Sequence, residues 1–506
     1  MTFTSFQFIL LFLPACYVGF LLVHRLLGWN GVYGYLALAS LVFYGMVAPL
    51  LAAILTVSVL FNYVMGTAIR LRRQENKPAG ILALAAIAAN LVALGYFKYT
   101  TFFIDIANSL AGTGIAHLDI IVPVGVSFFT FTQIGFLIEA LKGQVQRVGL
   151  HKYALFATFF PCVTAGPLLL QRDIFGQMDD RADRAFDSVA LSVGLTMFGI
   201  GLFKQVILAD SIAPYADIAF EGVAMGAAIA PMEAWLGSLA YSLQLYFDFS
   251  GYSDMAVGLG FMFGIRLPLN FNSPFKATSI SDFWRRWHMT MTRFFTTYLF
   301  TPMAMNNARS AQKNGHSSSR KWLQASALPI FYTFVMAGIW HGAGYTFVLY
   351  GLIHGLALAI DDGWKHFRMP PVGAPMGWAL TMAVVVSGLV MFRAPSVEVA
   401  TIMLSSMWGI TTLTGAGFGS DPVLIDVASA MTLILALGAV VLLAPNSQQI
   451  LRGTWISSDP PPESAVFREN PVRWVPNAAW AVVAAIVMVI GFTSLGGDTG
   501  FLDYSF

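Results

Sequence analysis

The segment LPIFYTFVMAGIWHG, residues 328–342, decides the fold class and directs the search for a site. It belongs to an apolar stretch, residues 324–343, long enough to cross the roughly 30 Å hydrocarbon core of a bilayer as a helix. His341 lies near the end of this stretch, although polar, titratable groups at membrane depth are costly and usually mark a site or a pathway. The sequence therefore predicts a membrane helix that carries a functional imidazole.

The composition of the whole chain is typical of a polytopic membrane protein. Of its 506 residues, 57% are hydrophobic and 11% are charged, against about 25% charged in ordinary soluble domains. The mean hydropathy is +0.69. Apolar runs recur from Phe6 to Phe492, so we predict a single all-α integral membrane domain over residues 1–506, surrounded by membrane lipid. The net charge of +2, without a dense basic stripe, argues against nucleic acid as a partner.

Hydropathy predicts about 11–12 transmembrane helices. Two further segments, near 153–170 and 288–305, are apolar but interrupted, and we expect re-entrant or interfacial helices there. Residues 305–321, rich in Ser, Asn and basic residues, are predicted to be a cytoplasmic loop, and residues 459–463 a stiff Pro-rich linker. The candidate spans are 5–23, 31–49, 51–69, 80–97, 121–141, 187–209, 236–258, 324–343, 345–361, 376–394, 423–444 and 476–494.

The positive-inside rule orients this set. Basic residues gather in alternate loops, among them 70–77, 142–152 and 266–321. The intervening loops carry acidic residues such as Asp119, Asp217 and Glu221. This pattern predicts that the N-terminus is outside the cytoplasm. Leu13-Pro14-Ala15-Cys16 is similar to a lipoprotein cleavage box, but no positive segment precedes it, so we expect the first helix to be retained.

Several polar side chains lie where lipid is expected. Asp248, Ser250 and Tyr252 fall in the predicted span 236–258, and Asp248 and Tyr252 share a helical face if the helix continues past Gly251. An ionised carboxylate facing lipid would be prohibitive, so Asp248 must meet protein, water or a proton. It is either part of a polar pair that orients neighbouring helices or part of a site.

Two other polar segments leave similar alternatives. Ser127, Thr130 and Gln133 recur every three residues, which indicates interhelical hydrogen bonds or a polar cavity wall. Residues 268–274, bracketed by prolines, cannot be regular helix. They either line a cavity at membrane depth or form a cytoplasmic loop.

The histidines have the chemistry of general bases. His288 closes the segment SDFWRRWH, residues 281–288, and His341 follows Trp340. Neutral imidazole accepts a proton near neutral pH. His354, in another predicted span, either supports a site residue without meeting the substrate or is a packed helix contact. No metal-ligand spacing, cysteine pair or Gly-x-Ser-x-Gly elbow is present, so we expect no metal and no serine nucleophile.

These motifs together resemble the membrane-bound O-acyltransferase (MBOAT) family, and within it the alginate O-acetylation branch. The resemblance rests on SDFWRRWH at 281–288, WHGAG at 340–344, YFDFSGYSD at 246–254, NFNSPF at 270–275 and LYGLIHG at 349–355. It covers most of residues 1–395. Two departures, Thr296-Thr297 and residues 302–305, fall in a region expected at the cytoplasmic entrance.

The resemblance implies a ring-like fold of helices around a thinned centre, where tunnels from the two membrane faces approach each other. It implies that His341 is the catalytic residue and that His288 helps to form or position the site. Residues expected in the tunnel or around the catalytic pair are Asp248, Ser250, Tyr252, Asn272, Arg285, Trp287, Trp340 and His354.

It also implies an acyl thioester donor in the cytoplasm, acetyl-CoA or a carrier protein, and no bound cofactor. Delivery outside would reach a polysaccharide acceptor, often through a periplasmic SGNH-type acetyltransferase partner. We therefore expect an O-acetyltransferase of the bacterial inner membrane with a periplasmic N-terminus. Alternatives are transfer of D-alanyl or another acyl group to a cell-wall polymer, an acyl-histidine intermediate, and a secondary transporter whose histidines relay protons, although we see no paired repeats.

Overall fold

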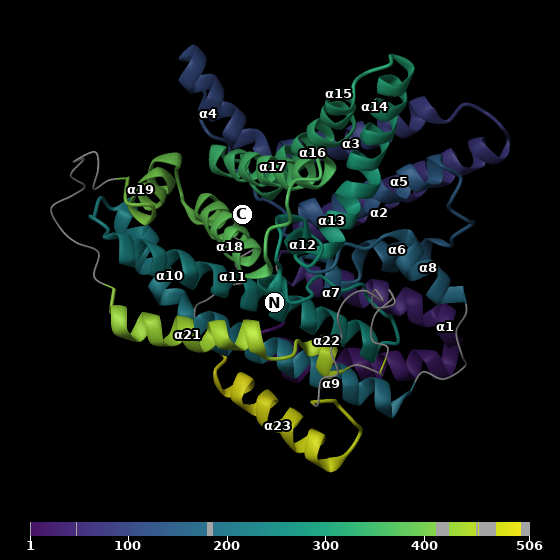
Figure 1. Ribbon diagram of the computed structural model, residues 1–506. Helices are drawn as coiled ribbons and strands as arrows, with labels where there is room; N and C mark the ends of the chain where they lie inside the picture. The colour runs from purple at the N-terminus through teal and green to yellow at the C-terminus, as the bar shows by residue number, and fades with distance from the viewer. Residues whose placement is uncertain are drawn as a thin grey trace. The chain divides into compact units, whose positions relative to one another are not determined.

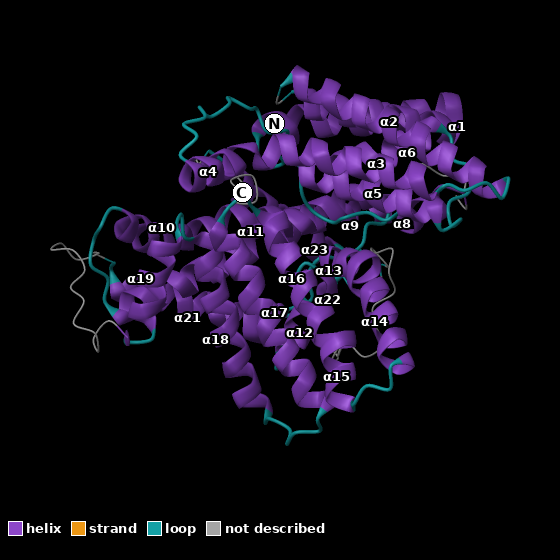
Figure 2. Cartoon of the chain, turned by 90° about the horizontal axis from the view of Figure 1, so that it is seen from above, coloured by secondary structure: helices purple, strands orange, loops and turns teal. Residues whose placement is uncertain are grey.

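The computed structural model describes residues 2–46, 48–179, 186–410, 425–451, 454 and 472–496 (Figure 1). These residues form helices joined by loops, and no β-strand occurs among them (Figure 2). The predicted all-α class is therefore confirmed. The described residues group into two compact units, Met1–Phe203 with Gly251–Leu269 and Ser447–Ser505, and Lys204–Ser250 with Asn270–Asn446. The single-domain organisation stays a prediction.

The first unit contains the N-terminal helices and the last one. Its main packing pairs are α1 with α6, α2 and α3 with α5, and α9 with α23. Its elements are η1 (Phe8–Phe12), α1 (Leu13–Gly45), α2 (Pro49–Gln74), α3 (Gly80–Leu94), η2 (Gly95–Tyr99), α4 (Thr100–Ala111), α5 (Val126–Leu141), α6 (Leu150–Thr158), α7 (Phe160–Val163), α8 (Gln171–Asp179), α9 (Ser188–Phe203), α22 (Ser447–Ile450) and α23 (Ala478–Thr493).

The second unit contains both histidine motifs. The long helix α11 (Pro231–Met262) begins in it and ends in the first unit. Its other elements are η3 (Lys204–Ala209), α10 (Asp210–Ala224), η4 (Pro274–Lys276), α12 (Ile280–Trp284), α13 (Met289–Phe295), η5 (Thr296–Phe300), α14 (Thr301–Lys313), α15 (Ser318–Trp322), η6 (Leu323–Ala327), α16 (Leu328–His341), α17 (Tyr345–His366), α18 (Ala374–Arg393), α19 (Val397–Met407) and α21 (Val427–Leu443).

Helix α1 is a hairpin of two arms. The chain reverses at Gly28, whose φ of 64° and ψ of −165° are not helical. The hydroxyl of Tyr35 then reaches back and donates to the carbonyl of Cys16 at 3.2 Å. A Cβ at Gly19 would lie 2.1 Å from that hydroxyl, so an added methyl group there would displace the Tyr35 side chain. The two predicted spans 5–23 and 31–49 are confirmed as these two arms.

The apolar helices have the length and exposure of a multi-pass membrane protein. Large apolar side chains such as Leu26, Ile81 and Leu110 are more than three-quarters exposed, which suits contact with lipid rather than water. Helices α5, α19, α21 and α23 are apolar but shorter. The six described helices long and apolar enough to span a bilayer are Phe8–Gly45, Pro49–Gln74, Gly80–Ala111, Ser188–Ala224, Ser318–His341 and Ala374–Arg393.

Three sequence predictions of local structure need correction. The loop predicted at 305–321 is mostly helical, in α14 and α15, because polar residues also suit a solvated helix. The span predicted at 121–141 begins only at Val126, after Pro123 and a left-handed Gly125. The acidic residues Asp217 and Glu221, predicted to lie in a loop, lie in helix α10. Asp217 forms an ion pair with Arg393 of α18 at 2.8 Å. The linker 459–463 lies outside the described residues.

The polar stripe on α5 joins neighbouring helices. Gln133 donates to the Ser58 hydroxyl of α2 at 3.0 Å and accepts from the Tyr153 hydroxyl of α6 at 3.4 Å. Interhelical hydrogen bonding thus accounts for Gln133, and it fixes α5 against both neighbours.

Candidate functional site

A tight helical hairpin positions His341. Helices α16 and α17 lie side by side (Figures 1 and 2) and cross closely because both contribute glycine at the contact. A Cβ at Gly338 would lie 2.3 Å from the carbonyl oxygen of Phe347, and one at Gly351 would lie 2.4 Å from that of Phe334. Small residues at such a crossing let the backbones approach. The hairpin therefore holds the C-terminal residue of α16, His341, in a fixed place.

The imidazole of His341 is partly buried among aromatic rings. Its centroid lies 4.9 Å from Trp340, 5.0 Å from Phe392 of α18 and 5.9 Å from Tyr350 of α17. All three rings meet it at interplanar angles of 68° or more. Gly342 continues in extended backbone and is required there, because a Cβ would lie 2.1 Å from the ring of Phe347. This ring cage restricts the orientations open to the imidazole.

His288 lies in a turn between α12 and α13. Its φ of 42° is left-handed, a conformation that costs a non-glycine residue about 1–3 kcal/mol and is often found at functional sites. The segment 268–274 holds this turn in place through the backbone. The Met289 amide donates to the carbonyl of Asn270, and the Asn272 amide donates to the carbonyl of Arg286, both at 2.9 Å.

Asn270 also sets the tautomer of His288. Its side-chain oxygen lies 3.3 Å from Nδ1 of His288 and accepts from the Thr290 hydroxyl at 2.6 Å. An amide oxygen can only accept, so Nδ1 of the imidazole is the donor. In the neutral ring Nε2 is then the acceptor. His288 is thereby prepared to receive a hydrogen bond rather than to donate one to a developing oxyanion.

Trp340 lies between the two histidines. Its centroid is 4.9 Å from His341 and 6.1 Å from His288, and the side chain is 5% exposed. Phe249 of α11 closes the other side of His288, edge to face at 4.8 Å. The structure therefore brings the two histidine motifs together, and the Trp340 indole contacts both imidazole rings.

His354 is the most buried histidine outside this pair. It is 1% exposed, and neither ring nitrogen has a hydrogen-bond partner among the described residues. Its ring lies 4.6 Å from Tyr350 and 5.2 Å from Trp284 of α12. His354 therefore contacts Tyr350, which contacts His341, and it also contacts the 281–288 motif.

Asp248 meets a partner on η3. Nε2 of Gln205 donates to Oδ1 of Asp248 at 2.8 Å, and both side chains are buried. This contact matches the predicted polar pair that joins neighbouring helices. Ser250 is also buried, and its hydroxyl has no partner among the described residues.

Tyr252 makes its contacts in the first unit, unlike Asp248. Its hydroxyl is 2.8 Å from that of Thr164, and its ring stacks on Phe3 at 4.9 Å. Tyr252 and Asp248 both lie on α11, but the contacts described for them fall in different units.

The other predicted residues surround the His288 turn. Trp287 stacks on Phe283 at 5.5 Å and is an aromatic packing residue. The Asn272 side-chain oxygen accepts from Asn446 at 3.3 Å. Arg285 is largely exposed and pairs loosely with Asp282 at 3.5 Å. Arg285 is thus a surface residue beside the site.

Sequence reasoning missed the residues that hold these groups. Asn270 lies in the motif NFNSPF and Gln205 lies in none of these motifs, and the partners of both are distant in sequence. Asp361 of α17 accepts from the backbone amide of Ser281 at 3.1 Å and from its hydroxyl, and so anchors α12. The available sequence signal for this contact was the acidic residue Asp361 at the end of the predicted span 345–361.

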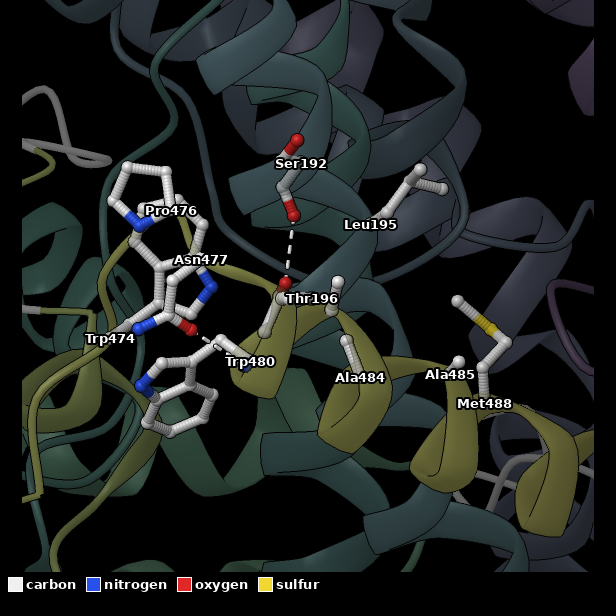
Figure 3. A pocket seen from close by; sticks show the side chains of 12 residues that line it. Ser192, Leu195, Thr196, Trp474, Pro476, Asn477, Trp480, Ala484, Ala485 and Met488 are labelled. Carbon is white, nitrogen blue, oxygen red and sulfur yellow. Dashed lines mark hydrogen bonds between the residues drawn. The ribbon is translucent and has the colours of Figure 1, made fainter.

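A separate pocket lies in the first unit between α9 and α23 (Figure 3). It has a volume of about 580 Å³. Its wall is mostly apolar, with Trp474 and Trp480 at one end and Met488 at the other. The polar side chains in view are bonded locally, as Thr196 is to the carbonyl of Ser192 at 2.7 Å. It contains no candidate site residue.

Comparison with known proteins identifies the family. The sequence profile of MBOAT, the membrane-bound O-acyltransferase family, matches residues 116–404. A peptidoglycan O-acetyltransferase of Helicobacter pylori is 30% identical over 99% of this chain and 96% of its own. A Pseudomonas aeruginosa protein named probable alginate O-acetylase is 34% identical over 81% and 76%. A teichoic acid D-alanyltransferase of Bacillus subtilis is 28% identical over 43% and 53%.

The fold is that of a multi-pass membrane protein, and its two histidine motifs meet at one buried indole. The chain belongs to the membrane-bound O-acyltransferase family. It is an acyltransferase, which displaces the transporter alternative.

Proposed function

We propose that this protein transfers an acetyl group from a cytoplasmic thioester, acetyl-CoA or an acyl carrier protein, to a hydroxyl reached from the periplasm. The observation that supports this proposal most is that the rings of His341 and His288 both contact the buried indole of Trp340. The names of the peptidoglycan and alginate relatives favour acetyl as the acyl group and a glycan as the acceptor.

In the proposed reaction His341 is the general base. It takes the proton of the attacking hydroxyl while the oxygen attacks the thioester carbonyl. The carbon–sulfur bond then breaks, an ester forms, and the proton passes to the leaving thiolate. A general base typically contributes about 10²–10⁴-fold, so orientation by the ring cage must contribute much of the remainder.

His288 would orient the donor. Its Nε2 is an acceptor in the neutral ring, which suits an N–H of the donor better than an oxyanion. Asp248 and Gln205 would keep η3 and α11 in register beside the site. Ser250 and His354 offer buried polar atoms to the passage that the resemblance implies, and Tyr252 would support α11 from its other end.

The setting proposed is the bacterial inner membrane, with a periplasmic N-terminus. An SGNH-type acetyltransferase in the periplasm would complete transfer to the polysaccharide, or the polymer itself would be the acceptor. Basic residues such as Arg72 and Arg73, in the last turn of α2, support the orientation.

Replacement of the base tests the proposal. We expect His341→Ala to lower acetylation of surface glycans at least about 100-fold, measured by mass spectrometry of the glycan fraction and by radiolabelled acetyl incorporation. His117→Ala is the matched control, because His117 is exposed and pairs with the exposed Asp105 at 2.7 Å, away from the two histidine motifs. Near-normal acetylation by a stably inserted His341→Ala protein would refute the assignment.

A second candidate is transfer of a D-alanyl group. The Bacillus subtilis relative supports it over less than half of this chain. Parallel incorporation of radiolabelled acetyl and alanyl groups separates the two, and trapping of labelled protein by rapid acid quench would reveal an acyl-histidine intermediate.

A further inference from the structure

The pocket between α9 and α23 lies on a pair of apolar helices. Helix α9 belongs to the segment Ser188–Ala224, which is long and apolar enough to span a bilayer. The pocket volume of about 580 Å³ falls within the roughly 300–1,000 Å³ of ligand pockets. The pocket lies wholly in the first unit, whereas both histidine motifs lie in the second.

The two helices run parallel, and the pocket follows their contact. A Cβ at Gly199 of α9 would lie 3.4 Å from Cε of Met488, and one at Gly491 of α23 would lie 3.0 Å from the Leu202 side chain. The first turns of both helices are therefore at the same end, where the two tryptophans line the pocket (Figure 3).

Another face of α9 is closed by α11. A Cβ at Gly194 would lie 2.7 Å from the carbonyl oxygen of Gly258, and one at Gly201 would lie 2.5 Å from that of Gly251. The backbones of α9 and α11 are thus in contact, and no ligand fits between them. The space for a ligand on α9 is on its face toward α23.

The wall of the pocket suits a hydrocarbon chain. The hydroxyls of Ser192 and Thr196 each donate to a backbone carbonyl four residues earlier, both at 2.7 Å. The indole N–H of Trp480 donates to the carbonyl of Arg473 at 3.0 Å. These donors are therefore already bonded within the protein. An apolar cavity does not hold water, so an acyl chain is the matching ligand.

The tryptophan end has the features of a membrane–water interface. Tryptophan is enriched at this depth, because its indole has an apolar body and a polar N–H. The amide of Trp480 donates to the Asn477 side chain at 2.9 Å, and the amide of Trp474 donates to the carbonyl of Ile450 at 2.8 Å. These bonds hold both indoles at the start of α23.

The charge at this end favours a phosphate group. Arg473 is exposed and is the only charged residue in segment 472–478. The carboxylate of Asp187, just before α9, accepts from two backbone amides of the first turn at 2.9 and 3.1 Å. Guanidinium groups match phosphate oxygens in charge and geometry. Anionic lipids of the cytoplasmic leaflet attract such basic residues beside membrane helices.

We propose that this pocket binds one phospholipid of the cytoplasmic leaflet, with an acyl chain between α9 and α23 and the phosphate at Arg473. The predicted orientation places the first turns of both helices on the cytoplasmic side. From Trp480 to Met488 the wall rises roughly 12 Å at about 1.5 Å per residue. That rise is close to the roughly 15 Å depth of one leaflet. The bound lipid joins the last described helix to α9.

Photolabelling of the delipidated full-length protein in dodecyl maltoside, a detergent without phosphate, tests this site. The probes are phosphatidylglycerol with a diazirine in one acyl chain and the diacylglycerol with the same chains. We expect mass spectrometry of peptides to locate the phosphatidylglycerol label on the pocket faces of α9 and α23. Arg473→Gln should lower this labelling about fivefold and leave diacylglycerol labelling unchanged.

Arg73→Gln is the matched control, because Arg73 is an exposed arginine in the last turn of α2 and does not line the pocket. Equal labelling of the Arg473→Gln and Arg73→Gln proteins would overturn the proposal. Equal losses for the two lipids in Arg473→Gln would also overturn it, because the phosphate contact would then be absent.

Filling the pocket tests the place of the acyl chain. Ala485 lines the pocket and is exposed, so Ala485→Phe should fold and should abolish labelling by both lipids. Val483→Phe is its control, because Val483 is 46% exposed on α23 and does not line the pocket. Equal labelling of these two variants would contradict the site.

A second copy of this chain is the competing occupant. Disulfide formation between two Ala485→Cys copies, without lipid label in the pocket, would favour that occupant and reject the lipid. Phosphatidylglycerol should raise the melting temperature of the delipidated wild type but not that of Ala485→Phe, and equal shifts would reject the site. Acetyl transfer is measured separately, so a failure of the proposed function would leave these lipid measurements unaffected.

Discussion

Gly388 of α18 lies against His354, and the absence of a side chain at this glycine leaves room for the imidazole ring. A Cβ there would lie 2.4 Å from Nε2 of His354, and His354 is enclosed by Trp284 and Tyr350. Gly388→Ala should therefore overpack this region and cost about 1–3 kcal/mol, seen as a lower melting temperature of the purified protein in detergent.

The same substitution should cost little in a His354→Ala background, because the obstructing ring is gone. Gly438→Ala on α21 is the control, since nothing lies within 4 Å of its added Cβ. A Gly388→Ala protein as stable as wild type would contradict the packing described for His354.

The reach of sequence reasoning is clearest among single residues. His288, His341 and Trp340 were identified because imidazole and indole groups are conspicuous in apolar segments. Asn270 was not assigned to the site, because its value lies in one contact to His288 that only the folded turn creates. Asp248 could be predicted to have a partner, but not that the partner is Gln205.

At the scale of elements, the α16–α17 hairpin should be intolerant of added atoms. Gly338→Ala would bring a Cβ to 2.3 Å from the backbone oxygen of Phe347, which cannot move without its helix. We expect a clear loss of thermal stability and an at least tenfold loss of acetyl transfer, because small displacements of a catalytic group are costly.

Gly34→Ala, in an open position on α1, should change neither property. Retention of full activity by Gly338→Ala would mean that the hairpin contact does not set the place of His341.

Hydropathy predicted the long apolar helices well, because their exposed sides are themselves apolar. Hydropathy failed to predict helices that carry charged or polar residues. Helix α10 carries three acidic residues, yet Arg393 reaches both Asp217 and Glu221 from α18. Helix α14 is polar and was read as a loop. Whether a polar segment forms a loop or a helix depends on such tertiary partners, and these partners are distant in the sequence.

For the whole molecule, the predicted orientation in the membrane can be read with single cysteines. Both native cysteines, Cys16 and Cys162, are buried, so they should react slowly. Asp119→Cys, in a predicted periplasmic loop, should react with a membrane-impermeant maleimide in cells whose outer membrane is permeabilised. Ser310→Cys on α14 should react only after the inner membrane is opened.

The reverse labelling pattern would invert the topology and place segment 266–321 on the wrong side for a cytoplasmic donor. The unsubstituted protein gives the background signal. Loop charge supplied this orientation from the sequence, whereas the division of the described chain into two units depends on contacts between distant segments.

The widened helical turns bear on how this chain is aligned with its relatives. In the described residues η1, η2, η3, η5 and η6 are π-helical and continue directly into α-helix. Each such turn accommodates an additional residue, so a relative lacking it differs by a one-residue gap within a helix. Placing that gap elsewhere would rotate the intervening positions by about 100° each. Lipid-facing residues of one protein would then be aligned with buried residues of the other, and the equivalents of Gln205 or Thr296 would be misassigned.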